Sequence, residues 1–138
     1  MSEMRFYTPQ EAEAAFYAAF MKHDVNAMMT VWAGDAKITC IHPLGPVLTG
    51  REAIRDSWVA IFRNAPDMQV IISEHSRVQE GELAIHTVEE HIRVKNEAPG
   101  RPVYATNVYR LTETGWRMVL HHAAPSPPPT KADTPTLH

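Results

Sequence analysis

The chain has little of several features that would point to a specialised class of protein. It contains a single cysteine, Cys40, so no disulfide can form within it, which fits a reducing cytoplasm. Its net charge is -3, and no lysine and arginine stripe with interleaved aromatic residues is present, so nucleic-acid binding is not expected. No apolar run approaches the roughly 20 residues of a membrane span, and the first residues lack the order of a signal peptide. We therefore expect a cytoplasmic protein that binds neither nucleic acid nor membrane.

The eight histidines do not have the spacing of a metal site. The sequence contains no His-x-x-x-His and no Cys-x-x-Cys motif. His121 and His122 are neighbours in a predicted strand, so their side chains should point to opposite faces and cannot chelate one ion. We predict no metal and no organic cofactor. A site assembled over long range from His42, His86 and His122 is the alternative that the sequence leaves open.

The remaining composition is that of an ordinary globular domain. Of 138 residues, 44% are hydrophobic and 21% are charged, enough for one domain with one core. Capping residues precede three predicted helices: Thr8 and Glu11 form a capping box, Asp24 caps a short second helix, and Thr49 and Glu52 form another box. Apolar residues recur at helical spacing in the first and third of these helices, namely Ala12, Phe16, Phe20 and Ile54, Trp58, Phe62.

The second half of the chain reads as strands. Short polar connections separate four β-rich runs and predict successive antiparallel hairpins. A twisted sheet of this kind curls, so helices first and strands after predict an α+β domain, an open cone whose concave face the helices cover. We predict one domain over residues 1–124 and a proline-rich, disordered tail over residues 125–138. The four runs are 69–78, 82–95, 103–112 and 116–123.

One histidine has a distinctive setting. His42 ends a short predicted strand, Pro43 stops that strand, and Gly45 turns the backbone toward the third helix. A histidine has a pKa near 6.5, so it can accept or donate a proton at neutral pH, or hydrogen-bond a ligand. His42 is therefore the candidate catalytic residue of this chain.

The order of elements resembles that of the NTF2-like superfamily. The resemblance rests on two helices, the strand ending in His42-Pro43-Leu44-Gly45, the helix after Gly50, and the curved sheet ending in the 115–122 run, and it covers residues 8 to 124. Within the superfamily the sequence is most similar to SnoaL-like and DUF4440-like proteins, relatives of ketosteroid isomerase and the polyketide cyclases. The resemblance implies a cone-shaped fold with three N-terminal helices on a curved, mostly antiparallel sheet. It says little about the reaction, because one fold hosts many functions.

The resemblance also gives His42 a role. In ketosteroid isomerases the matching strand ends in an aspartate followed by proline, and that aspartate moves the proton. His42 and Pro43 stand at the matching positions, and a histidine can transfer a proton as an aspartate does. The oxyanion-stabilising pair of those enzymes, a tyrosine on the first helix and a protonated acid on the sheet, is less well matched. Tyr17 lies on the expected helix, and Glu90 is the nearest acid, so steroid isomerisation is not expected.

Strand alternation predicts the rest of the pocket. Residues of one parity in the 82–95 run, including His86 and Glu90, and in the 103–112 run, including Asn107, should face the helices. His86 can instead be a satisfied interior histidine, Asn107 can satisfy a backbone group, and Glu90 can pair with Arg110 across the sheet. The predicted ligand-binding residues are Phe16, Phe20, Trp58, Phe62, His86, Asn107 and His122.

Two classes of function remain open. The first is a domain that binds a small apolar or carbonyl-bearing molecule with little or no catalysis, forming a homodimer through the outer face of its sheet. The second is a cofactor-independent isomerase, cyclase or hydrolase that uses His42 as general acid or base. An enzyme should place a second polar group within reach of His42 in a mainly dry pocket.

Overall fold

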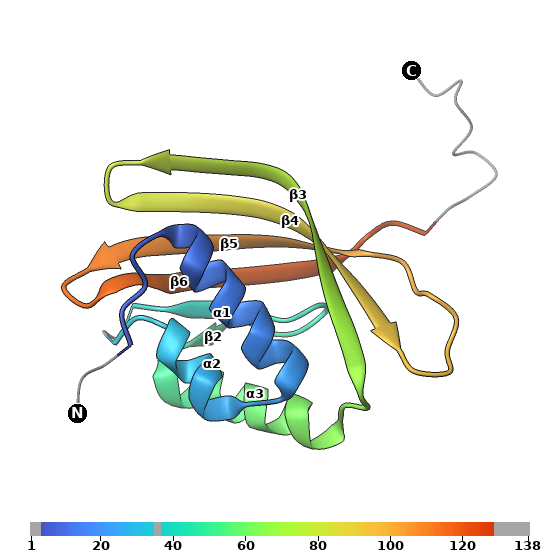
Figure 1. Ribbon diagram of the computed structural model, residues 1–138. Helices are drawn as coiled ribbons and strands as arrows, with labels where there is room; N and C mark the ends of the chain where they lie inside the picture. Colours follow the sequence, from blue (N-terminus) through green and yellow to red (C-terminus); the bar gives the residue numbers. More distant parts are fainter. Residues whose placement is uncertain (1–3, 35–36, 129–138) are drawn as a thin grey trace, which may run out of the picture.

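The computed structural model describes residues 4–34 and 37–128. In this part of the chain, helices α1 (Pro9–Lys22), α2 (Val25–Val31) and α3 (Arg51–Asn64) lie against one face of a single curved sheet (Figure 1). The α+β cone expected from the sequence is confirmed. None of the described helices is both long and apolar enough to cross a membrane.

Local sequence signals set the starts of the first two helices. Thr8 accepts a hydrogen bond from the backbone N–H of Glu11, and the Glu11 carboxylate in turn accepts from the backbone N–H of Tyr7. Asp24 accepts from the backbone N–H of Ala27. Both predicted caps are confirmed.

The predicted cap of α3 is wrong. Thr49 lies in a strand and pairs with Thr39, while Gly50 is the N-cap and makes no side-chain capping bond. The chain turns at Gly50 from strand into helix, and the backbone there has φ +90°. A residue with a side chain would be strained in this conformation, whereas glycine adopts it readily. Pairing within the sheet therefore overrides the local capping signal at Thr49.

The sheet has the order β2-β1-β6-β5-β4-β3. Strand β1 runs parallel to β6, and every other neighbouring pair is antiparallel. The long hairpin β3–β4 is strongly bent, whereas β5 and β6 run behind α1 (Figure 1). The strands are β1 (Thr39–Ile41), β2 (Leu48–Thr49), β3 (Met68–Glu80), β4 (Leu83–Val94), β5 (Val103–Thr112) and β6 (Gly115–Pro125).

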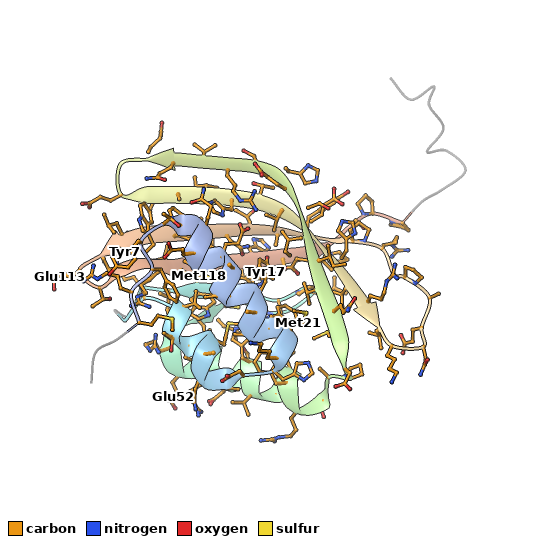
Figure 2. All side chains as sticks on the ribbon, in the orientation of Figure 1. Tyr7, Tyr17, Met21, Glu52, Glu113 and Met118 are labelled. Carbon is orange, nitrogen blue, oxygen red and sulfur yellow. The ribbon has the colours of Figure 1, made fainter. Side chains whose placement is uncertain are left out.

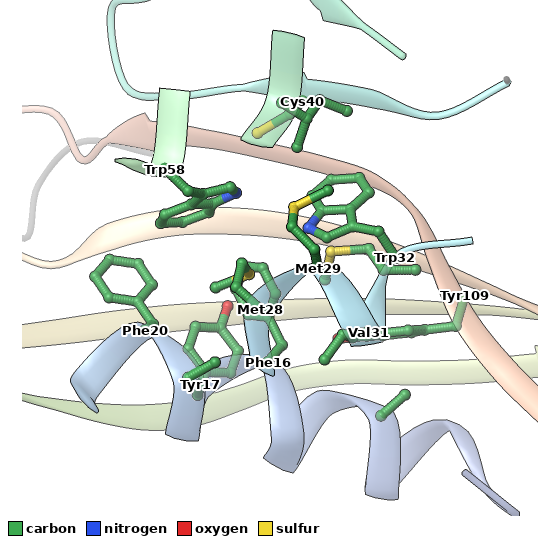
Figure 3. Close-up of a cluster of buried hydrophobic side chains, with 14 of the residues drawn as sticks. Phe16, Tyr17, Phe20, Met28, Met29, Val31, Trp32, Cys40, Trp58 and Tyr109 are labelled. Atoms are coloured by element: carbon green, nitrogen blue, oxygen red, sulfur yellow. The ribbon is translucent and has the colours of Figure 1, made fainter. Parts of the chain in front are cut away.

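Aromatic side chains from α1 and α3 fill the concavity (Figure 3). Phe16 packs edge-on against Trp58 at 5.7 Å and against Tyr17 at 4.8 Å between ring centroids. Phe20 also packs edge-on against Trp58, at 5.2 Å. Buried aromatic side chains contribute large apolar areas, so this cluster holds the two helices against the sheet.

A β-bulge in β6 decides which histidine faces the interior. Val108 pairs with Leu120 and Tyr109 pairs with Met118, so Val119 is an extra residue in its strand. Regular alternation would put His122 on the same face as Met118. The extra residue instead makes His121 face inward, 1% exposed, and leaves His122 exposed on the outer face.

The strand β6 runs further than the sequence predicted. Pro125 pairs with Val103, and the backbone N–H of Ser126 donates to the carbonyl of Pro102. The predicted disordered tail therefore starts too early at residue 125. Its residues 129–138 lie outside the described part of the chain.

Candidate functional site

A small cavity lies between the helices and the sheet, beside Trp58. Its volume is about 180 Å³, and the accessible surface of its wall is almost wholly apolar. Two histidines and one carboxyl group, from His42, His121 and Glu90, are the titratable residues in the wall. The remaining lining residues are Phe20, Pro43, Trp58, Ile61, Ile92 and Ala123.

His42 follows β1 and is held by the third helix. Its Nε2 lies 2.9 Å from the Ser57 hydroxyl, and its ring packs edge-on against Trp58 with 4.8 Å between centroids. Cys40, two residues earlier, places its sulfur 3.5 Å from the same nitrogen. Burial lowers the pKa of His42 from its ordinary value of 6.5, because desolvation disfavours the charged ring. His42 is thus mainly neutral at pH 7 and able to accept a proton.

Glu90 is the carboxyl group of the cavity wall. Burial raises the pKa of its carboxyl from 4.5 to about 7, although the hydrogen bond from Tyr17 opposes the rise. The Tyr17 hydroxyl lies 2.7 Å from Glu90 Oε2, so Tyr17 of α1 reaches β4; Figure 2 labels Tyr17 where α1 crosses the sheet. Near neutral pH the carboxyl is therefore divided between a protonated donor form and a charged acceptor form.

A buried hydrogen-bond chain connects Glu90 to His121. The Asn107 amide donates to the Tyr17 hydroxyl at 2.9 Å, and the Asn107 oxygen accepts from His121 Nδ1 at 2.6 Å. Burial lowers the pKa of His121 to about 3, with smaller contributions from the charges of His42 and His122. His121 therefore stays neutral in the folded protein at ordinary pH, as a hydrogen-bonding group.

The structure brings several of the predicted residues to the cavity. His42, Phe20 and Trp58 line it, whereas Phe16 and Phe62 stand behind Trp58, with their ring centroids 5.7 and 5.3 Å from its centroid. Asn107 faces inward as predicted but acts through Tyr17 and His121, not by lining the cavity.

Two further predicted residues, His122 and His86, lie away from the cavity. His122 was placed there from regular alternation, but the bulge at Val119 turns it to the outer face. His86 is buried, and its Nδ1 lies 2.6 Å from a Glu13 carboxylate oxygen, away from the cavity. The alternative interpretation of His86 as a satisfied interior histidine is the one that its contacts support.

Glu13 forms the centre of a separate charged cluster. Its carboxylate binds both His86 and Arg77 of the sheet. Burial raises the pKa of Glu13, but the hydrogen bonds from His86 and Arg77 outweigh burial and leave the pKa lowered. This cluster ties α1 to β3 and β4.

The register of the sheet also decides between two partners for Glu90. Glu90 stands opposite Val103 in β5, whereas Arg110 stands opposite Leu83, so a cross-strand pair of Glu90 with Arg110 is excluded. Tyr17 is the observed partner, and the acid and tyrosine that the sequence matched only loosely do meet.

A larger hollow of about 950 Å³ opens where α2, the start of α3 and the β5–β6 hairpin meet. Although it is larger than the cavity at His42, two of the arginines that line it, Arg51 and Arg117, have structural partners. Arg51 donates to the carbonyls of Met29, Trp32 and Ala33, and Arg117 donates to those of Met4, Thr30 and Thr114. These contacts hold the ends of elements together, so the smaller cavity is the better candidate site.

Within residues 4–34 and 37–128, no group of three or more histidine, cysteine, aspartate or glutamate side chains is placed to hold an ion. Cys40 is buried, and burial raises the pKa of its thiol to about 12, so the free thiol is protonated at neutral pH.

Comparison with known proteins places the chain in a family. The family description of the SnoaL-like domain matches residues 10–128. A crystal structure from Thiobacillus denitrificans, named as a candidate calcium/calmodulin-dependent protein kinase type II association domain, is 41% identical, with a TM-score of 0.88 over 91% of this chain and 100% of that one. A structure from Streptomyces avermitilis, named as a candidate dehydratase of the NTF2-like family, is 30% identical, with a TM-score of 0.75 over 85% of this chain and 92% of that one.

More distant proteins share the fold or part of the sequence. A ketosteroid isomerase-like protein from Erwinia carotovora is 15% identical with a TM-score of 0.65, over 86% of this chain and 94% of that one, which shows the fold alone. The F-box protein SKIP8 of Arabidopsis thaliana is 26% identical over 111 residues, 79% of this chain and 46% of that protein. The chain thus spans about half the length of this curated relative. Given the match over residues 10–128, the chain belongs to the SnoaL-like domain family of the NTF2-like superfamily.

Proposed function

We propose that the chain binds a small, mainly apolar molecule bearing a carbonyl group in the cavity beside Trp58, and that His42 exchanges a proton with it. The observation that carries the proposal is the meeting in one apolar cavity of His42, whose pKa burial lowers, and Glu90, whose pKa burial raises to about 7. Groups with shifted pKa values in a concave, mainly dry site are typical of catalytic positions.

The cavity limits the size of the ligand. Its volume of about 180 Å³ is below the ~300–1,000 Å³ of typical ligand pockets, so it suits a single ring better than a steroid. Glu90 lines the cavity, and near neutral pH part of its carboxyl is protonated and can donate a hydrogen bond. Such a donor favours a ligand that carries an acceptor such as a carbonyl oxygen.

The proposed chemistry uses the two groups in complementary states. Neutral His42 accepts a proton from the carbon next to the carbonyl group, and the electron pair of that C–H bond moves into the carbonyl to form an enolate. The protonated carboxyl of Glu90 donates a hydrogen bond to the enolate oxygen, and His42 then returns the proton. Activity should follow a bell-shaped pH profile that falls above the Glu90 pKa of about 7 and below the pKa of His42.

Cyclohexanone is a suitable probe, because it is a single ring with a carbonyl group. Titration calorimetry should detect its binding, and NMR in D₂O should detect catalysed exchange of the hydrogens next to its carbonyl. Ala123→Val narrows the cavity and should abolish binding, whereas Ala124→Val, on the exposed face, should not. His42→Ala should slow exchange by about 10²-fold or more, and the exposed His122→Ala should leave it unchanged. Equal binding by the two valine variants would refute the site, and unchanged exchange in His42→Ala would refute its role.

A second proposal concerns assembly and has its own observation. Four aliphatic residues stand opposite one another in a row across the outer face of the sheet: Val78, Ile85, Val108 and Leu120. Val78 is 50% and Ile85 is 42% exposed, which is a large apolar contribution to the surface of a monomer. The Thiobacillus denitrificans relative is named as an association domain. We propose that two copies of the chain form a homodimer through this row.

A further inference from the structure

The contacts of Ser57 fix the position of one hydrogen atom in the candidate site. Its hydroxyl oxygen lies 2.6 Å from the carbonyl oxygen of Ile54 and 2.9 Å from Nε2 of His42. A carbonyl can only accept, and a serine hydroxyl has one hydrogen to donate. If that hydrogen pointed at His42, two oxygen acceptors would face each other at 2.6 Å with no proton between them. The hydroxyl must therefore donate to Ile54 and accept from His42.

We infer that Ser57 is a positioning residue that holds neutral His42 in the tautomer with hydrogen on Nε2, leaving Nδ1 as the nitrogen that accepts and returns the proton. A neutral imidazole carries hydrogen on one nitrogen only, so a hydrogen donated from Nε2 leaves the lone pair on Nδ1. The assignment of the tautomer depends only on the contacts of Ser57. The role of Nδ1 as the proton acceptor depends in addition on the proton exchange proposed above.

The second histidine of the cavity is held in the opposite tautomer. Because the Asn107 amide nitrogen donates to Tyr17, its oxygen remains to accept, and the group that donates to it is Nδ1–H of His121. The lone pair of His121 is then on Nε2. The two ring centroids are 6.3 Å apart, so one site holds both forms of a neutral imidazole.

The two opposite tautomers give the inference an internal reference. Long-range proton–nitrogen NMR correlations on the full chain with ¹⁵N-labelled histidine distinguish a protonated ring nitrogen from one with a free lone pair. At neutral pH we expect His42 to be protonated at Nε2 and His121 at Nδ1. Observation of His42 with its hydrogen on Nδ1 would overturn the assignment.

Variants at position 57 test the cause. Ser57→Ala removes the acceptor and should shift His42 to a mixture of tautomers, while the His121 signals stay as they are. Ser57→Thr keeps a hydroxyl group and should restore the Nε2–H form. The exposed Ser73→Ala, on β3, is the matched control and should change neither histidine. A His42 spectrum that is unchanged in Ser57→Ala would refute the assignment to Ser57.

The cyclohexanone assay then tests the role of Nδ1 separately. Ser57→Ala should lower the rate of hydrogen exchange about 10-fold or more, because a misaligned base loses much of its effect, while the affinity for cyclohexanone stays the same. Ser57→Thr should recover the rate. If wild-type His42 has the expected tautomer but the protein catalyses no exchange, the proposed function fails and the tautomer assignment stands. If exchange occurs but Ser57→Ala leaves its rate unchanged, the positioning role fails.

Discussion

Replacing Glu90 by glutamine should change how the stability of the protein depends on pH. In the unfolded chain the carboxyl has its ordinary pKa of 4.5, and burial raises that pKa to about 7 in the folded protein. Between these two values the folded state binds the proton more tightly than the unfolded state does. The free energy of unfolding contributed by Glu90 therefore falls as the pH rises from 4.5 to about 7, and stays constant above that.

The magnitude follows from the two pKa values. The interval between 4.5 and about 7 corresponds to about 3 kcal/mol at roughly 1.4 kcal/mol per pH unit. Glu90 is 2% exposed, so solvent does little to screen this effect. Glutamine keeps an oxygen to accept from Tyr17 and does not ionise. From about pH 5 to pH 8, the stability of Glu90→Gln relative to wild type should rise by about 2–3 kcal/mol.

Urea unfolding followed by tryptophan fluorescence at a series of pH values measures this difference. Any loss from imperfect packing of the new amide is the same at each pH and does not affect the comparison. His121, whose pKa burial lowers to about 3, contributes a slope of the opposite sign, but it is present in both proteins and cancels. The exposed Glu80→Gln is the control and should follow wild type. Stability curves of Glu90→Gln and wild type that run parallel from pH 5 to pH 8 would refute the raised pKa.

Two further predictions concern the outer face and the N-terminal segment. Ile85→Lys places a charge in the aliphatic row of the sheet and should reduce the mass found by light scattering from that of two chains to the 15.5 kDa of one chain. Glu97→Lys, in the loop after β4, should leave the mass unchanged. A wild-type monomer at micromolar concentration would contradict the homodimer. Gly115→Ala should lower the free energy of unfolding by about 1–3 kcal/mol, because Gly115 has φ +107° and an added Cβ would lie 2.6 Å from the carbonyl oxygen of Phe6. Gly100 has open space around it, so Gly100→Ala should have little effect in the same urea assay. Equal losses of stability in the two variants would contradict the proposed strain at Gly115.

The sequence was enough to predict the architecture, because the signals for it are local and repeated. Capping at Thr8 and Asp24 and the apolar spacing of Phe16 and Phe20 agree with the helices that form. Alternation along the β4 strand placed Glu90 on the buried face. These patterns need only the periods of a helix and a strand, which depend on backbone geometry and not on distant contacts.

The site was harder to predict, because its contacts join residues far apart in the chain. Tyr17 and Glu90 are 73 positions apart, and only the loose match to the paired groups of ketosteroid isomerases brought them together before the structure did. Ser57 lies next to Trp58 on α3, and its contact with His42 depends on how that helix packs beside β1. The cap at Thr49 failed for the same reason, since pairing with Thr39 is a tertiary contact.

His121 and His122 offer the sharpest test of this difference between local pattern and tertiary structure. Alternation from Met118 predicts that His122 faces the interior, and the bulge at Val119 reverses the prediction. His121→Ala should lower the free energy of unfolding by about 3 kcal/mol or more, because it empties a buried site and leaves the oxygen of Asn107 without a donor. His122→Ala, on the exposed face, should change it by no more than about 0.5 kcal/mol in the same urea assay. If His122→Ala were the damaging change and His121→Ala the neutral one, β6 would have regular alternation, and His122 instead of His121 would face the cavity.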